Sequence, residues 1–468
     1  MYYTLKILNF SSIKIVKQVK HAKTVYKNKS GVKTLSNKNL TIIAIIFLIN
    51  SVILANDWPN WRGPFMNGST DETNLPSTWS KTENVAWIVE MPGSSSATPI
   101  IYDDKVFISS MDKSSNDLLA LCFNALTGDL VWEKTIAQSD REAPRNNLAT
   151  PSPTTDGKYV YFMFGSGDLA ALDFQGEIIW SRNIEDKYGN ISQKYGYSSS
   201  PLVFEDKLYI LVLRRDSSYR KPQGDNLDSF LLAVDTATGN DIWKQIRQSD
   251  VEDESLDSYS SPILFDNGES TEILAIGASL ITSNDPQTGK ELWRYKYPEN
   301  ERKKGMDRNI SSVVTGEGLI FGIPPRGVLG MLALKSGQKN VLSDEDIAWK
   351  FDGPAPDCST PLYYKGNIYV LADRTGGVLT CLDAKTGNKK WQGELGGSDP
   401  WWASLTAGDD KLYCISEKAE VVVLEAGGEI FKILSKIEMD DDPVQSSIAI
   451  ANGNLYIHIA NKLYCISD

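Results

Sequence analysis

Histidine, the residue most often used for metal binding and acid–base catalysis, occurs only twice in this 468-residue sequence. His21 stands in the basic start of the chain, and His458 stands in the apolar run LYIHIA near its end. A single His in the body cannot build a His-dependent zinc cluster or a two-histidine mechanism, so we expect His458 to be structural. The sequence also lacks G-x-S-x-G, P-loop and GxGxxG motifs in a strand–helix setting. These residue types predict no catalytic residue and no metal site.

Cysteines and acidic runs are further candidates for reactive or metal-binding groups. The sequence contains five widely spaced cysteines: Cys122, Cys358, Cys381, Cys414 and Cys465. An odd, dispersed set is not a disulfide framework, and we expect small buried hydrophobic side chains. The acidic run Asp440, Asp441 and Asp442 is expected to be solvated and not to bind a metal.

A further group of residues has the chemistry of ligand binding. It combines aromatic rings and amides with one guanidinium and one carboxylate, groups that hold a sugar, a quinone or a peptide. The group consists of Asn147, Tyr197, Tyr259, Arg308, Asn309, Asp357, Trp401 and Trp402. Alternatively, these side chains fill a funnel and satisfy one another. Whether these side chains bind a ligand or fill the funnel depends on the strands and loops that position them.

Those elements follow from a nine-residue phrase that recurs along the chain, as in DTATGNDIW (235–243) and DAKTGNKKW (383–391). The aromatic residue that ends the phrase recurs at intervals of 40 to 63 residues, with Phe431 as the last copy. The other members of the series are Trp87, Trp132, Trp180, Trp243, Trp293, Trp349 and Trp391. Between them, short runs rich in β-branched and aromatic residues alternate with tight polar turns, which is typical of β-strands.

Four such strands in each repeat predict the blade of a β-propeller. The eight aromatics delimit seven complete units, and the remainder, 435–468, has only three strand-like runs. Residues 84–90 are a lone copy of the fourth. We therefore predict an all-β, eight-bladed propeller of four-stranded antiparallel blades. In this arrangement the N-terminal strand joins the C-terminal blade and closes the ring, which removes open sheet edges.

The phrase has a structural explanation. Its Thr-Gly step makes a tight turn because Gly accepts a positive φ, and the Asp before it can accept N–H groups of the turn. The seven Trp side chains of the series are large enough to cover the seam with the next blade, where the indole N–H can find a carbonyl. We expect these tryptophans to dock neighbouring blades and not to bind a ligand.

The topology assigns a binding site to one face of the ring. The first-to-second and third-to-fourth turns are short, whereas the second-to-third and blade-to-blade loops are long and varied, including 133–150, 181–199, 214–229 and 294–311. Variable loops on a rigid scaffold carry binding. We expect the eight candidate binding residues to surround the channel mouth on this long-loop face.

The start of the chain differs in composition from the rest. Residues 1–55 contain nine Lys and no acidic residue, and they end in the apolar run 41–55. This pattern predicts a secretory signal or, if it is not cleaved, an anchor at 41–55, although such a run is short for a bilayer span. The predicted division is a leader at 1–55, an N-terminal extension at 56–83 and the propeller at 84–468. We expect an exported protein, periplasmic or secreted.

The body of the chain is acidic. Removing the nine positive charges of the leader from the net charge of −12 leaves −21. Nucleic-acid binding needs clustered Lys and Arg, so this charge disfavours a nucleic-acid partner. No membrane span is expected unless the leader is retained, and we expect a monomer.

The phrase D-x-x-T-G-x-x-x-W resembles the docking motif of quinoprotein-type (PQQ-like) propeller repeats, and this resemblance extends over about residues 84–468. DWPNWRGP, 57–64, resembles the start of secreted bacterial PQQ-like repeat proteins. The resemblance implies one of two functions. PQQ-dependent dehydrogenases bring a carboxylate-rich Ca²⁺ site, an Asp base and often a disulfide between adjacent cysteines, whereas BamB-type members are assembly scaffolds.

The residues favour the second function. The chain has no adjacent Cys pair, and no set of Glu, Asn and Asp stands out as a calcium site. We therefore predict a non-catalytic propeller that binds a protein or glycan partner of the cell envelope through its long-loop face, without a cofactor. The alternative is a quinoprotein dehydrogenase that binds PQQ with Ca and acts on alcohols or sugars.

Overall fold

The computed structural model describes residues 57–468 except 192, 215–227, 299–304, 306–307, 326–329, 375, 398 and 440–442. The leader, the acidic run at 440–442 and parts of three of the long loops thus lie outside the described residues. The description below concerns the unit Ala55–Asp468. In the described ranges no helix is both long and apolar enough to cross a membrane.

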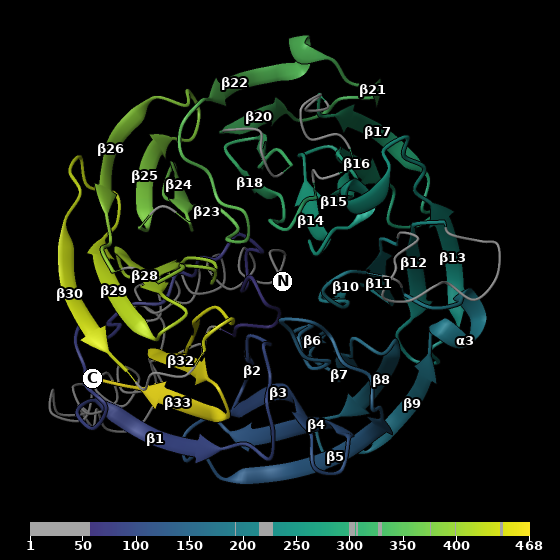
Figure 1. Cartoon of the computed structure of the whole chain (residues 1–468), viewed down its shortest axis with the longest axis vertical. Coiled ribbons are helices and arrows are strands. Elements are labelled where there is room, and N and C mark those ends of the chain that lie inside the picture. Colours follow the sequence, from purple (N-terminus) through teal and green to yellow (C-terminus); the bar gives the residue numbers. More distant parts are fainter. Residues whose placement is uncertain are drawn as a thin grey trace, which may run out of the picture. The chain divides into compact units, whose positions relative to one another are not determined.

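The described residues form eight sheets that follow one another around a central axis (Figure 1). The first four contain β2 (Ile100–Tyr102), β3 (Lys105–Asp112), β4 (Asp117–Asn124) and β5 (Leu130–Gln138); β6 (Thr154–Thr155), β7 (Tyr159–Met163), β8 (Asp168–Asp173) and β9 (Ile178–Asn183); β10 (Leu202–Phe204), β11 (Lys207–Val212), β12 (Phe230–Asp235) and β13 (Asp241–Ile246); and β14 (Ile263–Asp266), β15 (Thr271–Gly277), β16 (Leu280–Asn284), β17 (Glu291–Lys296) and β21 (Asn340–Val341).

The other four sheets contain β18 (Val314–Gly316), β19 (Leu319–Gly322), β20 (Met331–Lys335) and β22 (Ile347–Phe351); β23 (Leu362–Tyr364), β24 (Asn367–Ala372), β25 (Val378–Asp383) and β26 (Lys389–Glu394); β27 (Thr406–Gly408), β28 (Lys411–Ile415), β29 (Glu420–Glu425) and β30 (Ile433–Glu438); and β31 (Ala449–Ala451), β32 (Asn454–Ile459), β33 (Lys462–Ile466) and β1 (Val85–Glu90). One short helix, α3 (Glu185–Tyr188), lies in a blade-to-blade loop. The predicted eight-bladed, all-β propeller is confirmed.

The last sheet combines strands from opposite ends of the described chain. Its order is β1-β33-β32-β31, and β1 pairs antiparallel with β33, with Trp87 opposite Cys465. The lone strand copy at 84–90 thus supplies the fourth strand of the sheet whose other three strands end the chain.

Burial differs between the inner and outer strands of a blade. Every residue of β11 is buried, whereas β13, at the outer edge of the same sheet, is mostly half-exposed. Neighbouring blades cover both faces of the inner strands, so apolar clusters form across the seams. One such cluster joins Phe107 and Trp132 of the first blade to Phe162 of the second. The hydrophobic effect of these seams holds the ring together.

The phrase-ending tryptophans reach across the seams. The indole N–H of Trp180 donates to the carbonyl of Thr236 in the next blade at 2.9 Å. The same bond to the next blade, at 3.0 to 3.2 Å, is made by Trp87, Trp132, Trp243, Trp349 and Trp391. The turn glycine lies under the ring: a Cβ at Gly239 would stand 2.7 Å from Trp180. Glycine is required there both for space and for its φ of +72°.

The Asp that opens the phrase organises the turn. One carboxylate oxygen of Asp235 accepts the backbone N–H groups of Ala237 at 3.1 Å and Thr238 at 2.8 Å, and it also accepts the Thr238 hydroxyl at 2.7 Å. The turn is therefore satisfied locally, and the phrase holds blades together without facing a ligand.

Trp293 departs from this pattern. Its indole N–H donates to the Glu272 carboxylate of its own blade at 3.0 Å. The connection that follows β20 carries no Thr-Gly turn; instead β21 pairs parallel with β17 and adds a fifth strand. Gly337 in this connection has no heavy atom within 4 Å of a built Cβ. Here a strand takes the place of the docking turn.

The cysteines and His458 fill structural positions. All five cysteines are free thiols; four are buried and Cys358 is half-buried. His458 is only 2% exposed, and its Nε2 lies 2.8 Å from the carbonyl oxygen of Ala460. Burial lowers the pKa of His458 to about 4, so the ring is neutral at physiological pH.

Candidate functional site

A pocket opens on the propeller axis, on the long-loop face. Its walls come from residues that precede or begin the inner strand of nearly every blade, together with one residue of the N-terminal extension. It is lined by Trp61, Ser96, Thr98, Arg145, Asn146, Thr150, Ser152, Tyr195, Ser198, Ser200, Tyr259, Ser261, Arg308, Ile310, Cys358, Thr360, Arg374, Trp402, Ser404, Gln445 and Ser447.

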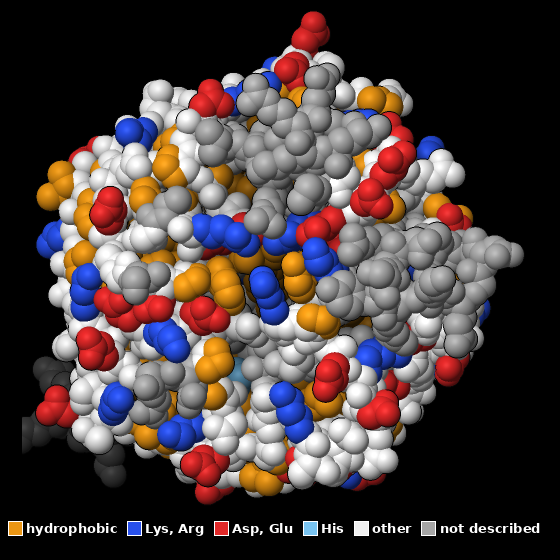
Figure 2. Space-filling model, viewed as in Figure 1, with side chains coloured by type: hydrophobic (Ala, Val, Ile, Leu, Met, Phe, Trp, Pro, Cys, Tyr) orange, Lys and Arg blue, Asp and Glu red, His pale blue; other side chains and the backbone are white. Residues whose placement is uncertain are grey.

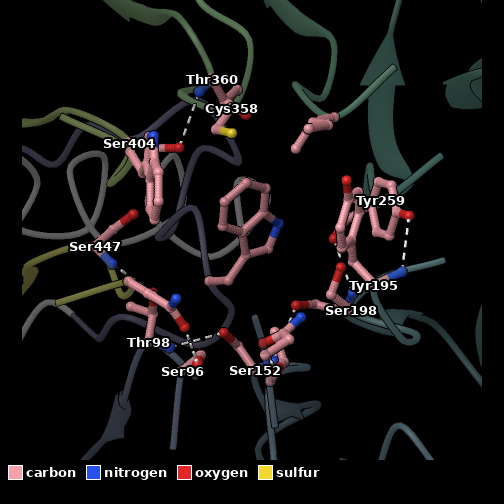
Figure 3. Close-up of a pocket in the computed structure, with 18 of the residues that line it drawn as sticks. Ser96, Thr98, Ser152, Tyr195, Ser198, Tyr259, Cys358, Thr360, Ser404 and Ser447 are labelled. Atoms are coloured by element: carbon pink, nitrogen blue, oxygen red, sulfur yellow. Dashed lines mark hydrogen bonds between the residues drawn. The ribbon is translucent and has the colours of Figure 1, made fainter. Parts of the chain in front are cut away.

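A belt of hydroxyl side chains surrounds this pocket. The hydroxyl belt consists of the Ser or Thr that comes just before each inner strand: Thr98, Ser152, Ser200, Ser261, Ser312, Thr360, Ser404 and Ser447. In seven of the eight junctions, the backbone N–H of one member donates to the hydroxyl of the next at 2.8 to 3.0 Å. Figure 3 shows this bond between Thr360 and Ser404.

The belt has a clear physical cause. Its backbone N–H groups lie before the strand ladders begin, so they need side-chain acceptors. A hydroxyl that accepts one bond still carries a proton that it can donate. All belt members except Ser312 line the pocket. The pocket wall is therefore a ring of hydrogen-bond donors for carbonyl or carboxylate oxygens.

Four aromatic side chains add flat apolar surfaces to the polar wall. They are Trp61, Tyr195, Tyr259 and Trp402. The Tyr195 and Tyr259 rings have centroids 6.1 Å apart, and the Tyr259 hydroxyl accepts the backbone N–H of Tyr195 at 3.2 Å (Figure 3). The indole nitrogen of Trp402 is buried and has no hydrogen-bond partner among the described residues. Such surfaces suit a planar ligand with polar edges.

Charged side chains form an alternating series along one side of the pocket, which we call the charge arc: Lys194, Glu254, Arg308, Asp357 and Arg374. Lys194 contacts Glu254 at 3.0 Å, and Arg308 contacts Glu254 and, at 3.2 Å, Asp357. Arg374 contacts the same Asp357 oxygen as Arg308. The arc joins four successive blade-to-blade loops and so fixes their relative positions.

Arg308 is the centre of the charge arc, with a side chain only 5% exposed. Burial alone would lower the pKa of its guanidinium, but the Asp357 and Glu254 carboxylates outweigh burial and raise it. The group therefore remains a fixed positive charge in the pocket wall.

The pocket as a whole favours anions. Its lining residues include Arg145, Arg308 and Arg374, and among the described residues none of them is Asp or Glu. Lys and Arg side chains gather around the centre of the face seen in Figure 2, interleaved with hydrophobic side chains. A concave site with this charge attracts a carboxylate-bearing ligand.

A buried carboxylate behind the wall fixes the loop that carries Asp357 and Cys358. The side chain of Asp373 accepts the backbone N–H groups of Asp357 at 3.0 Å, Cys358 at 2.5 Å and Ser359 at 3.2 Å. Burial raises the pKa of Asp373, and these N–H bonds partly counter that rise. Asp373 thus positions one end of the charge arc.

Three of the eight predicted binding residues, Tyr259, Arg308 and Trp402, line the pocket. Asp357 lies directly behind Arg308 in the charge arc. Asn147 lies at the margin, where its side-chain amide donates to Ser96 at 2.8 Å.

The structure places the other three predicted residues outside the central pocket. Tyr197 and Trp401 are buried, at 2% and 0% exposure, in seam clusters between blades. Asn309 is buried, and its side chain accepts the backbone N–H of Ser279 at 3.3 Å.

Several lining residues were missed by the sequence prediction. Arg145 and Tyr195 lie two residues before Asn147 and Tyr197, within the same loops. Arg374 belongs to the second-to-third loop after β24, where only the loop class was predicted. Trp61 stands in DWPNWRGP, 57–64, from which the sequence predicts no binding residue. Because these loops do not repeat, the sequence gives no signal that distinguishes a lining residue from a residue two positions away.

The described residues contain no group of three or more His, Cys, Asp or Glu side chains that could hold a metal ion. The acidic run at 440–442 lies outside them. The carboxylates nearest the pocket, Glu254 and Asp357, are engaged by basic side chains of the charge arc.

Known proteins similar to this chain include dehydrogenases. Over 164 residues the chain is 26% identical to a polyvinylalcohol dehydrogenase of a Pseudomonas species; the match spans 34% of this chain and 24% of the relative. A quinohemoprotein alcohol dehydrogenase from Comamonas testosteroni superposes with a TM-score of 0.63 at 14% identity, covering 90% of this chain and 82% of the other. A europium-containing methanol dehydrogenase gives 0.65 at 11% identity, covering 89% and 92%.

BamB also has this fold. BamB from Moraxella catarrhalis superposes with a TM-score of 0.56 at 13% identity, covering 81% of this chain and 98% of the other. At these identities the structural likeness shows the fold alone. Nevertheless, the relative matched in sequence is named a dehydrogenase. The prediction of a non-catalytic scaffold as the main function was therefore wrong, and these findings favour the dehydrogenase alternative.

A family model described as outer membrane protein assembly factor BamB matches this chain over residues 69–257, 198–347 and 281–436. These overlapping matches cover most of the propeller and follow its repeats. The chain belongs to this family of PQQ-like repeat propellers.

Proposed function

We propose that this protein is a quinoprotein-type dehydrogenase, which binds a PQQ-type quinone in the central pocket and oxidises alcohols. The observation that carries the proposal is the composition of the pocket. Three guanidinium groups, a belt of hydroxyls and four aromatic side chains converge on the propeller axis. The dehydrogenases among the similar proteins support the reaction class.

The pocket residues fit such a quinone. PQQ is a flat fused-ring molecule with three carboxylates and two adjacent carbonyl groups. Arg145, Arg308 and Arg374 would hold the carboxylates, since guanidinium groups bind carboxylates through paired N–H donors. The belt hydroxyls and the buried indole N–H of Trp402 would donate to the remaining oxygens. The aromatic side chains would cover the ring faces.

The role of the chain in catalysis would be orientation and charge. A bound quinone supplies the chemistry by accepting two electrons from the alcohol. Arg308 and Arg374, both held by Asp357, would keep positive charge beside a bound quinone. Asp373 fixes the loop that carries Asp357, so the guanidinium groups are preorganised.

A metal ion is a separate question for this site. Calcium and lanthanide ions require several oxygen ligands, and the described residues do not bring together an acidic cluster of that kind. We therefore derive no catalytic step through a metal. The experiment below therefore measures quinone binding both with and without a metal ion.

The experiment is reconstitution of the purified protein. The chain is incubated with PQQ in three arms, with Ca²⁺, with a trivalent lanthanide and with EDTA, and is then separated from free quinone by gel filtration. The expected result is quinone absorbance that travels with the protein, and dye reduction with methanol, ethanol or polyvinyl alcohol. Absence of bound quinone in all three arms would overturn the proposal.

Export is a second part of the proposal. The Lys-rich start followed by the apolar run at 41–55 supports a periplasmic or secreted location. Cell fractionation with N-terminal sequencing tests it. Recovery of the protein from the cytoplasm with Met1 retained would contradict export.

A further inference from the structure

The N-terminal extension enters the propeller channel. We call residues 57–70 the strap (Figure 1, purple). At its start, Trp58 exchanges backbone hydrogen bonds with Ile101 of the first blade at 2.9 and 3.0 Å. The carbonyl of Pro59 accepts the N–H of Thr155 in the second blade at 3.0 Å. The strap thus begins with an isolated β-bridge to the first blade and a backbone hydrogen bond to the second.

The other end of the strap is fixed on the seventh blade, two blades from the first around the ring. The carbonyl of Gly68 accepts the N–H of Ala407 in the seventh blade at 2.9 Å, and the N–H of Thr70 donates to the Ala407 carbonyl at 2.9 Å. Between the two ends, the Met66 sulfur accepts the N–H of Leu264 in the fourth blade at 3.4 Å. Each of these contacts lies two or three residues beyond a belt residue. The strap therefore crosses the channel on the inner side of the hydroxyl belt.

Arg62 holds the middle of the strap, and among the described residues it forms no ion pair with a carboxylate. Its guanidinium donates to the backbone carbonyls of Leu405, Pro361 and Asn67, each at 2.9 Å. The side chain is 1% exposed, and burial lowers its pKa to about 9. Burying a guanidinium costs free energy that carbonyl bonds offset only in part. An apolar side chain would fill this volume at lower cost, so a role in positioning explains its presence.

Trp61 is the residue that Arg62 positions. It lines the central pocket, and the Arg62 guanidinium carbon lies 5.5 Å from its ring centroid. On the other side, Asn60 accepts the N–H of Arg62 at 3.0 Å and donates to the carbonyl of Gly63 at 2.9 Å. The backbone of Trp61 is thereby fixed between two hydrogen-bonded neighbours.

From these contacts we infer that the strap completes the ligand site. Trp61 forms the aromatic floor of the central pocket, and Arg62 is a positioning residue that holds this floor against blades six and seven. The propeller alone leaves the pocket open toward the channel. The inference rests on the proposed function only in that the ligand is a planar quinone.

The experiment compares four proteins: the native chain, Trp61→Ala, Arg62→Met and the control Leu75→Ala. Leu75 is 2% exposed and belongs to the same N-terminal extension, but it packs near Gly408 and does not line the pocket. PQQ binding is measured by calorimetry, and the melting temperature is measured in parallel. We expect Trp61→Ala to weaken binding at least about tenfold with little change in melting temperature.

The two remaining variants separate positioning from stability. We expect Arg62→Met to weaken quinone binding. We expect Leu75→Ala to lower the melting temperature without weakening quinone binding. A fifth protein, Arg62→Lys, keeps the charge but not the three carbonyl bonds, and we expect it to bind the quinone as weakly as Arg62→Met. Native affinity in Trp61→Ala or Arg62→Met would overturn the inference while leaving the proposed function intact. Failure of the native protein to bind PQQ under every metal condition would overturn both.

Discussion

The backbone N–H of Ser447 donates to the hydroxyl of Thr98 at 3.0 Å, joining residues 349 positions apart in the sequence. This bond links the sheet that ends the chain to the first complete blade, and it belongs to the hydroxyl belt. The belt therefore lines the pocket and also fastens the ring at that junction.

Thr98→Val tests the fastening role. The substitution keeps the shape of the side chain but removes the acceptor of the buried Ser447 N–H. We expect a loss of about 1–3 kcal/mol in the free energy of unfolding, because a buried donor is left without a partner. Thr98→Ser, which retains the hydroxyl, is the matched control. Denaturant unfolding in which both variants are equally stable would show that the bond contributes nothing.

The docking phrase can be tested with a matched pair of glycines. Gly239 and Gly337 both have φ of +72°, but only a Cβ at Gly239 would collide with an indole, that of Trp180. We expect both Gly→Ala variants to suffer the backbone penalty of about 1 kcal/mol. The free energy of unfolding of Gly239→Ala should fall by roughly a further 1–3 kcal/mol, because the added Cβ overpacks the contact with the indole. Equal melting temperatures for the two variants would contradict the docking role.

The acid stability of the protein should depend on His458. Its pKa is lowered to about 4 in the folded protein, against 6.5 for an ordinary His. The unfolded chain therefore binds the proton more tightly. This contribution to stability is fully present above pH 6.5 and is lost as the pH falls to about 4, a total of roughly 3 kcal/mol.

His458→Gln removes the titrating group and should flatten the pH dependence of the unfolding free energy between pH 6.5 and 4. The slope, and not the absolute stability, is the measured quantity, since Gln also changes the local packing. An unchanged slope would mean that His458 is not responsible for the loss of stability between pH 6.5 and 4.

The charge at the pocket can be tested on Arg374. Arg374→Gln removes one guanidinium from the lining, and we expect PQQ affinity to fall about tenfold or more, the size of one charge-assisted carboxylate contact. Arg182→Gln is the control, because Arg182 pairs with Asp241 at 2.7 Å near the outer edge of a blade. Equal affinity in the two variants, measured by calorimetry, would remove Arg374 from the binding site.

The repeating part of this molecule was predictable because its signals are local. The phrase around Asp235 specifies its own turn, and the spacing of the tryptophans predicts the blades. Trp293 was assigned the same docking role, yet it bonds to Glu272, because the replacement of the next turn by β21 cannot be recognised from its own repeat.

The site was less predictable because it is made from parts that do not repeat. The Ser/Thr-Pro steps were visible as openings of the repeat, but the bonds of the hydroxyl belt depend on the register between blades. Trp61 enters the pocket from a segment outside the propeller, and Tyr195 differs from the predicted Tyr197 by one turn of an irregular loop. The prediction of a non-catalytic scaffold failed because it relied on the absence of motifs from the sequence. The charge of the pocket comes instead from side chains of separate loops, which only folding brings together.

The strap also has a kinetic consequence. Its residues are synthesised before any blade, yet Ala407 and Leu405, to which it binds, are made more than three hundred residues later. The end of the strap that binds Leu405 and Ala407 therefore has no partner there until the seventh blade has been made. Contacts of such long sequence separation slow folding and prolong the exposure of apolar surface. Folding of this chain should consequently finish in one late step that requires its last third. Truncation from the C-terminus should remove the partners of the strap in the seventh blade, so that the strap does not cross the channel.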